Sequence, residues 1–219
     1  MINLENSHIT YAIDNSMRLT LTIYKYLSEE RKYIDEIVKL YLEKTNLQHM
    51  TNQLTYCIHE LAGNACKANT KRSYFKKMNL NIEDDAQYQE GMKSFREDVY
   101  TDMEKFHDTT KQSGYYIKFQ IKRSEDTIDL SILNNTVLTP KEESKIQEKF
   151  EAVKDYENVA EAFADLEDAS EGAGLGIAMM VIMLKEMGLP PENLRIFTAD
   201  NETHAVLNLP LQSQTTLAQ

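Results

Sequence analysis

Cysteine is scarce in this sequence, and the histidines are scattered. The two cysteines, Cys57 and Cys66, lie nine residues apart within one helical pattern. That spacing is more than two helical turns, so the two thiols cannot form a disulfide bond unless the helix unwinds. The five histidines and two cysteines nowhere show the short spacings of a zinc site. We therefore expect reduced core thiols and no metal site of the Cys/His kind.

Long apolar runs and excess positive charge are also absent. No stretch approaches the roughly 18 apolar residues of a membrane-spanning helix, and the residues after Met1 lack the apolar region of a secretory signal. The net charge of −11 argues against nucleic acid and anionic membrane as partners, because their phosphates would repel the surface. We expect a cytoplasmic protein that binds neither.

The 219 residues, 42% of them hydrophobic, suffice for one large domain, or for a domain with a helical appendage. Residues 7–44 repeat apolar residues at steps of three and four, with a break and cap at Ser28-Glu29-Glu30. This pattern predicts an N-terminal helical hairpin over residues 1–45. Such a hairpin packs either on its own domain or against a second copy of the chain, so a homodimer through these helices stays open.

A third helix is predicted from about residue 46 to residue 69. At 100° per residue, Glu60, Asn64 and Lys67 share one face, roughly 100° away from an apolar stripe. The stripe consists of Leu54, Ile58, Leu61, Ala65 and Ala68. The polar face is either a solvated surface or a site in which a carboxylate and a carboxamide act together.

The remaining segments are predicted to differ in secondary structure. Residues 71–112 are highly charged with aromatic residues at helical spacing, which predicts a helical insertion whose basic cluster, residues 71–77, is either solvated or binds a phosphate or partner. Residues 115–121 and 127–133 alternate as a β-hairpin does, and so do 194–198 and 205–209. Residues 139–171 carry eleven acidic residues against four lysines and are predicted to be a mobile cover. Residues 212–219 are expected to be a frayed tail.

Three glycines occupy alternate positions, Gly172, Gly174 and Gly176, and lead directly into an apolar segment with helical spacing. Such a turn aims backbone N–H groups at one point beside a helix N-terminus, which favours an anion such as phosphate. The Gly-Lys-Ser/Thr of a Walker loop is missing, and Ile177 breaks the dinucleotide-binding spacing. The alternative is a flexible loop before a buried helix.

Two fragments together resemble a known family. Residues 59–67, His-Glu-Leu-Ala-Gly-Asn-Ala-Cys-Lys, resemble the N box of the GHKL ATPases, and residues 171–178, Glu-Gly-Ala-Gly-Leu-Gly-Ile-Ala, resemble their G2 box. This superfamily contains histidine kinases, gyrase-type topoisomerases, ninety-kilodalton heat-shock chaperones and mismatch-repair ATPases. The resemblance implies an α+β fold over residues 46–211, a two-layer α/β sandwich of the Bergerat ATP-binding type. Its sheet would be mixed but mostly antiparallel, covered on one face by the N-box and G2-box helices, with residues 139–171 as an ATP lid.

The same resemblance implies roles for single residues. Asn64 would coordinate a Mg²⁺ ion that bridges the phosphates of ATP, because a hard cation accepts carboxamide oxygen. Glu60 would be the catalytic carboxylate, one helical turn from that ligand. Lys67 would contact a phosphate. The G2 box would contribute backbone donors from Gly172, Gly174 and Gly176, and turn packing from Leu175.

One family motif is altered. The G1 box, Asp-x-Gly-x-Gly, falls at residues 134–138, where Asn134 replaces the aspartate and Thr136 and Leu138 replace the glycines. The aspartate normally accepts a hydrogen bond from the adenine amino group. Asn134 keeps a carbonyl oxygen that can accept it, so we expect weakened adenine recognition.

The resemblance leaves two functions open. The first is a signalling ATPase domain that transfers phosphate from Mg·ATP to a partner protein, as histidine kinases or anti-sigma-type serine kinases do. No histidine has the usual context of a phosphoacceptor, and only His8 has a suitable position, so the acceptor is expected on another protein. The second is an inactive binding or phosphotransfer scaffold. Clamp closure of the topoisomerase kind is disfavoured because no transducer domain is present.

Overall fold

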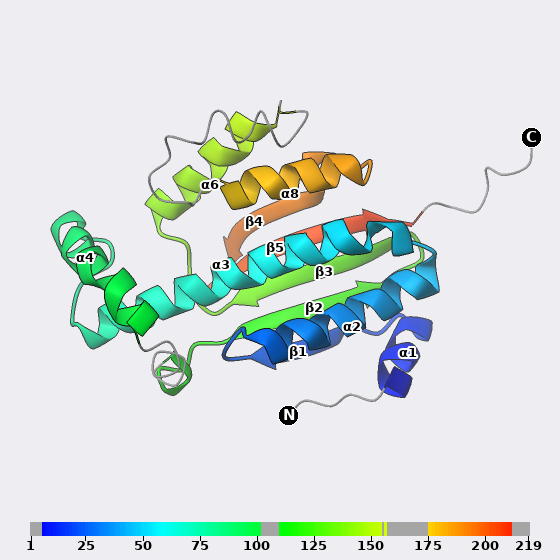
Figure 1. The fold of residues 1–219 in the computed structure, drawn as a ribbon, viewed down its shortest axis with the longest axis horizontal. Coiled ribbons are helices and arrows are strands. Elements are labelled where there is room, and N and C mark those ends of the chain that lie inside the picture. The colour runs from blue at the N-terminus through cyan, green and yellow to red at the C-terminus, as the bar shows by residue number, and fades with distance from the viewer. Residues whose placement is uncertain (1–5, 102–109, 155, 157–174, 212–219) are drawn as a thin grey trace, which may run out of the picture.

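The computed structural model describes residues 6–101, 110–154, 156 and 175–211, which form two layers (Figure 1). One layer is a five-stranded sheet in the order β1-β2-β3-β5-β4. The strands are β1 (Leu19–Ile23), β2 (Ile117–Arg123), β3 (Thr127–Asn134), β4 (Leu194–Ala199) and β5 (Glu202–Pro210). The second layer contains helices α2 (Ser28–Thr45), α3 (Thr51–Lys77) and α8 (Leu175–Glu186), which lie in front of the sheet in Figure 1. The class is α+β, as predicted.

Alternation along the strands separates the two faces of the sheet. In β2, Ile117, Phe119 and Ile121 are at most 1% exposed, whereas Lys118 and Gln120 between them are partly exposed. Because successive side chains of a strand point to opposite faces, the apolar set packs under the helices. The polar set faces away from them. One hydrophobic core therefore lies between the sheet and the helices.

The expected mixed sheet is a wrong prediction, because every strand pair in the described residues is antiparallel. The two predicted hairpins, β2–β3 and β4–β5, are confirmed. Asp200 and Asn201 join β4 to β5 with φ angles of 51° and 61°, the left-handed conformation of two-residue hairpin turns. The hairpins dock side by side because β5 pairs antiparallel with β3.

The prediction of an N-terminal helical hairpin is wrong for the segment between its two helices. Helices α1 (Asn6–Asp14) and α2 are present, but residues 19–23 form the edge strand β1, with Leu21 opposite Phe119 of β2. The segment Leu-Thr-Leu-Thr-Ile has period two and suits a strand with one buried face. Residues 6–45 therefore share the sheet and the core with the rest of the chain and do not precede it as a separate unit.

Helix α3 is longer than predicted. It follows a short 3₁₀ turn, η1 (Gln48–Met50), and runs on through Lys77 into the predicted insertion. The insertion continues with α4 (Asp85–Thr101), and the described part of residues 71–112 is helical, as predicted, apart from the turn at residues 78–84. A second apolar cluster joins α4 to the end of α3 and consists of Tyr74, Phe75, Leu80, Ile82, Tyr88, Met92 and Phe95. In Figure 1 this appendage extends beyond the sheet.

The predicted lid begins with helix α6 (Pro140–Val153), and the rest of it, apart from residues 154 and 156, lies outside the described residues, as does the predicted tail. The Thr139 side chain caps α6 by accepting from the Glu142 N–H at 3.2 Å, and the Glu142 carboxylate accepts from the Thr139 N–H at 3.0 Å. A short turn, η2 (Pro191–Asn193), connects α8 to β4. None of the helices described here is long and apolar enough to cross a membrane.

Candidate functional site

Helix α3 presents Glu60 and Asn64 on one face, as the spacing predicts. The Asn64 amide nitrogen, Nδ2, donates to Oε1 of Glu60 at 3.2 Å. Asn64 is exposed and Glu60 is partly buried. Lys67, the third residue of the predicted polar face, is exposed close to one helical turn beyond Asn64. A carboxylate, a carboxamide and an ammonium group thus follow one another along an accessible surface.

The Glu60 carboxylate also contacts the beginning of α8. A Cβ atom placed on Gly176 would lie 2.2 Å from Glu60 Oε1, which is closer than atoms can approach without one of them moving. Gly176 is the second residue of α8, so the carboxylate lies against the first turn of that helix. A negative charge is favourable there because the first N–H groups of a helix have no acceptor within it and the dipole is positive at that end. The structure therefore brings Glu60 of the predicted N box into contact with Gly176 of the predicted G2 box.

The rest of the predicted phosphate loop is described only in part. Gly172 and Gly174 lie outside the described residues. Leu175 is half-buried at the first position of α8. The G2 segment thus enters a helix at the predicted place, and α8 buries Ile177, Ala178, Met180, Val181, Ile182 and Leu184.

Asn134, the last residue of β3, lies in a buried polar cluster that the sequence analysis missed. Its Nδ2 donates to Asn69 Oδ1 at 3.1 Å and to the Thr136 hydroxyl. Asn69 in turn donates its own Nδ2 to the Tyr116 carbonyl at 2.9 Å, and the Thr203 hydroxyl donates to the Thr136 carbonyl at 2.6 Å. We call Asn69, Asn134, Thr136 and Thr203 the amide cluster. All four are at most 8% exposed.

One feature of the sequence indicates the amide cluster. Asn69 follows Ala65 by four residues, so it continues the buried stripe of α3. An asparagine in such a stripe needs a hydrogen-bonding partner, because burying an amide without one is costly. The partner, Asn134, is 65 residues away, and sequence spacing gives no means of pairing the two.

A second missed group joins the N box to the N-terminal segment. His59 lies 2.9 Å from Asp35 of α2 through Nε2 and contacts the Tyr26 hydroxyl through Nδ1. The Arg31 guanidinium lies 5.0 Å above the Tyr26 ring. Burial lowers the pKa of His59, and the Asp35 carboxylate opposes that shift. These contacts hold α2 and the chain before it against the helix that carries Glu60.

The basic residues Lys71 and Arg72 have a role that sequence analysis did not anticipate. Arg72 Nη2 lies 2.7 Å and Lys71 Nζ 3.1 Å from the Glu142 carboxylate, and Arg72 also donates to the Val137 carbonyl. Burial acts to raise the pKa of Glu142, but the two cations outweigh it and hold that pKa at about 2. The ion pairs fasten the start of α6, the first helix of the predicted lid, to α3.

Comparisons with known proteins leave the family of this chain open. No family model matches the sequence. The chain is 33% identical, over 219 residues, to an uncharacterized protein of Treponema pallidum (strain Nichols), covering 98% of this chain and 43% of that protein. It therefore spans less than half the length of this relative. Among solved structures it is similar to a chain of the SiaB–SiaC complex from Pseudomonas aeruginosa, with a TM-score of 0.46 and 12% identity over 95% of this chain and 99% of that one.

Proposed function

We propose that this chain is a signalling protein that binds Mg·ATP and phosphorylates a partner protein. The observation that carries the proposal is the contact between the Glu60 carboxylate and the backbone of Gly176. It joins a carboxylate and carboxamide pair on one helix to the N-terminus of another, which is the combination that a metal-bound phosphate needs.

The residues present suit Mg·ATP at its phosphate end. Since Nδ2 of Asn64 points to Glu60, its carbonyl oxygen is the atom left to serve as a metal ligand. The N–H groups of the first turn of α8, including those of Leu175 and Gly176, have no acceptor within the helix and suit phosphate oxygens, and Lys67 can neutralise charge from the exposed side. The two-layer arrangement agrees with a Bergerat-type fold, which we propose for this chain. Bound ATP would supply the phosphoryl group.

Within such a complex the chain would act by positioning and by charge. Glu60 lies one turn from Asn64, close enough to orient a hydroxyl group or water beside the metal. We place the phosphoryl acceptor on a partner, because no histidine of the chain has the sequence context of a phosphoacceptor.

A second function, a binding scaffold that does not turn over ATP, is favoured by the amide cluster. The Nδ2 group of Asn134 is engaged by Asn69 and Thr136, and the residue is 4% exposed. The position that recognises adenine in the GHKL family is therefore tied into the interior. Adenine could reach Asn134 only if the side chains around it moved.

Calorimetric titration with ATP, with and without Mg²⁺, distinguishes the two functions. For the ATP-binding protein we expect micromolar affinity that falls at least tenfold without Mg²⁺ or after Asn64→Ala. Asn52→Ala, which removes an exposed asparagine elsewhere on α3, is the matched control and should leave affinity unchanged. No heat at millimolar ATP from the folded protein would overturn the proposal and leave the scaffold.

A further inference from the structure

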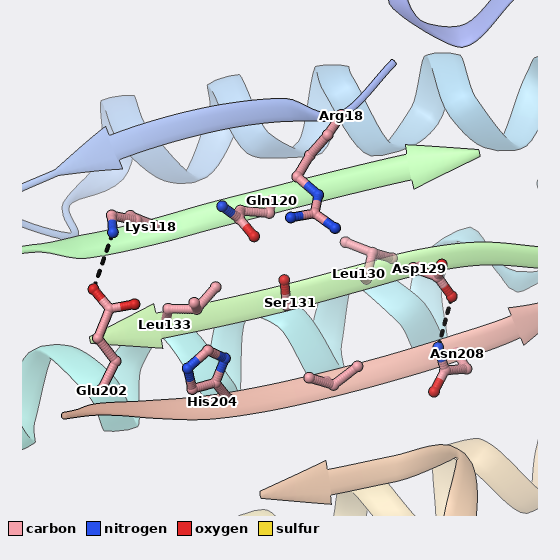
Figure 2. A pocket seen from close by; sticks show the side chains of 11 residues that line it. Arg18, Lys118, Gln120, Asp129, Leu130, Ser131, Leu133, Glu202, His204 and Asn208 are labelled. Atoms are coloured by element: carbon pink, nitrogen blue, oxygen red, sulfur yellow. Dashed lines mark hydrogen bonds and ion pairs between the residues drawn. The ribbon is translucent and has the colours of Figure 1, made fainter. Parts of the chain in front are cut away.

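The face of the sheet turned away from the helices carries a hollow of about 410 Å³ (Figure 2). It is lined by residues of the loop before β1 and of strands β2, β3 and β5. The polar lining relevant here is Arg18, Lys118, Gln120, Ser131, His204 and Asn208. Since Glu60 contacts α8 in the helical layer, the hollow lies on the opposite face of the sheet from the proposed ATP site.

The acidic groups of the hollow already have partners. Glu202 accepts from Lys118 Nζ at 2.9 Å and from the Tyr116 hydroxyl at 3.0 Å. Asp129 accepts from Asn208 Nδ2 at 2.6 Å. Both pairs are drawn as dashed contacts in Figure 2. Glu202 therefore neutralises Lys118, whereas Asp129 keeps its negative charge because its partner Asn208 is neutral.

Arg18 is the second cation that lines the hollow, besides Lys118. Its guanidinium extends over the middle of the hollow, toward Gln120 and Ser131 (Figure 2). Within the part of the chain that the structure describes, no carboxylate lies within ion-pair distance of it. A planar guanidinium with several N–H donors matches a carboxylate through two parallel hydrogen bonds. Arg18 and Asp129 therefore line one hollow without forming an ion pair, and the guanidinium is left to pair with a carboxylate of a ligand.

His204 adds a polar atom without a partner. Its Nε2 is buried, and no described residue makes a hydrogen bond to it. The imidazole ring stacks on Phe197 of β4, with centroids 5.4 Å apart and planes 9° apart, so its orientation is fixed. A buried nitrogen left without a partner is costly, and a ligand that hydrogen-bonds to it would recover that cost.

The rim extends the positive charge across the strands. By the alternation of side chains, Lys122 of β2 lies on the same face as Lys118 and opposite Asp129 of β3, and Arg195 of β4 lies opposite Val206 of the lining. The cations Arg18, Lys118, Lys122 and Arg195 outnumber the carboxylates Asp129 and Glu202 here, in contrast to the net charge of −11 of the whole chain. Such a contrast favours an acidic partner and steers it to one side of the molecule.

We propose that this face docks an acidic segment of a partner protein, with one carboxylate side chain seated on Arg18 beside Ser131 and His204. One guanidinium that forms no ion pair with the described residues matches a single carboxylate through two parallel hydrogen bonds. The hollow is shallow and polar, unlike the deep apolar pockets that enclose small molecules, and the open sheet face around it suits a peptide chain. Lys122 and Arg195 then serve neighbouring acidic residues of the same segment.

The docking surface is tested without nucleotide, so its outcome is independent of the proposed ATP site. The probe is a fluorescein-labelled hexaglutamate peptide, followed by fluorescence anisotropy at low salt, with labelled hexaglutamine as the uncharged comparison. We expect saturable binding of hexaglutamate alone. Arg18→Gln should weaken it at least fivefold, and Ser131→Glu, which places a carboxylate in the hollow, should abolish it.

Lys39→Gln is the matched control, because it removes the same charge from an exposed site on α2. It should leave hexaglutamate binding within twofold of the wild type. Circular dichroism verifies that each variant is folded. The proposal is overturned if hexaglutamate does not bind, if hexaglutamine binds equally well, or if Lys39→Gln weakens binding as much as Arg18→Gln does.

Discussion

Asn134 stands where the proposed G1 box would have an aspartate, and its buried hydrogen bonds require an amide. Asn134→Asp would place a carboxylate against Oδ1 of Asn69, which can only accept, and the Tyr116 carbonyl holds the Asn69 amide in that orientation. We expect this buried, poorly paired charge to lower the free energy of unfolding by about 2–4 kcal/mol. Urea unfolding at pH 7 measures the change.

The same substitution at an exposed position separates burial from chemistry. Asn52→Asp on α3 should change the free energy of unfolding by no more than about 0.5 kcal/mol. If Asn134→Asp were as stable as the wild type, the amide cluster would not require an amide at position 134, and the prediction would be contradicted.

The contact of Gly176 with Glu60 gives a second prediction. Gly176→Ala would push the Glu60 carboxylate away from the first turn of α8, because the new methyl group occupies its place. In a Glu60→Ala background that clash is gone. We therefore expect a coupling energy of about 1 kcal/mol between the two substitutions in a double-mutant cycle of urea unfolding.

Gly63 provides the comparison for that cycle. It lies within α3, and a Cβ atom there would meet nothing within 4 Å. Gly63→Ala should raise the free energy of unfolding by about 0.5–1 kcal/mol, since alanine favours the helix. If the effects of Gly176→Ala and Glu60→Ala on the free energy of unfolding were additive, the close approach of the two residues would not contribute to stability.

At the scale of residues, sequence spacing predicts what a single helix determines. The common face of Glu60 and Asn64 follows from 3.6 residues per turn, and their hydrogen bond agrees with it. The contact of Glu60 with Gly176 joins positions 116 residues apart, so only the resemblance to a family could suggest it. The pairing of Asn69 with Asn134 could not be predicted from spacing either, because these residues are also far apart in the sequence.

At the scale of elements, long or strictly alternating segments were predicted and a short ambiguous one was not. Strands β2, β3 and β5 alternate over six or more residues, which leaves little choice of structure for the two hairpins. Residues 19–23 fit a strand by alternation, but Met17, Leu21 and Tyr24 also fit helical spacing. Pairing with β2, almost 100 residues later in the sequence, makes this segment a strand.

The fastening of α6 to α3 gives a prediction that depends on pH. The pKa of Glu142 falls from its ordinary 4.5 to about 2 in the folded state. Its ion pairs therefore stabilise the fold fully above about pH 4.5, and this contribution disappears as pH falls toward 2. Glu142→Gln should lower the free energy of unfolding by about 3 kcal/mol at pH 7, because Arg72 and Lys71 lose their counter-charge.

Urea unfolding of both proteins at pH 7, 4 and 3 follows this difference, which should shrink steadily with falling pH. The neighbouring Glu143 is exposed, so Glu143→Gln is the matched control and should change stability by no more than about 0.5 kcal/mol at any of these values. A difference between wild type and Glu142→Gln that stays constant from pH 7 to 3 would contradict the assigned pKa.

At the scale of the whole molecule, one core joins segments that the sequence analysis had divided between two units. Ile9 and Ile13 of α1, Leu21 of β1 and Ile34 of α2 belong to the same buried cluster as α3, α8 and the sheet. The chain between residues 6 and 45 completes the sheet edge and covers part of it. The predicted division at residue 45 failed because helical periodicity shows which side of a segment is buried and not what it is buried against.

This single core predicts how the thiol of Cys57 reacts. Cys57 is 0% exposed, its Sγ lies 4.0 Å from the Met180 carbonyl of α8, and burial raises its pKa to about 12. In a Cys66→Ser variant, a disulfide reagent at pH 8 should therefore reach Cys57 only when α3 and α8 separate. We expect the logarithm of the labelling rate to rise linearly with urea, with the slope of equilibrium unfolding, since both then report exposure of the whole core. A rate that is independent of urea at low concentrations would reveal a local opening between the two helices and contradict a core that unfolds as one unit.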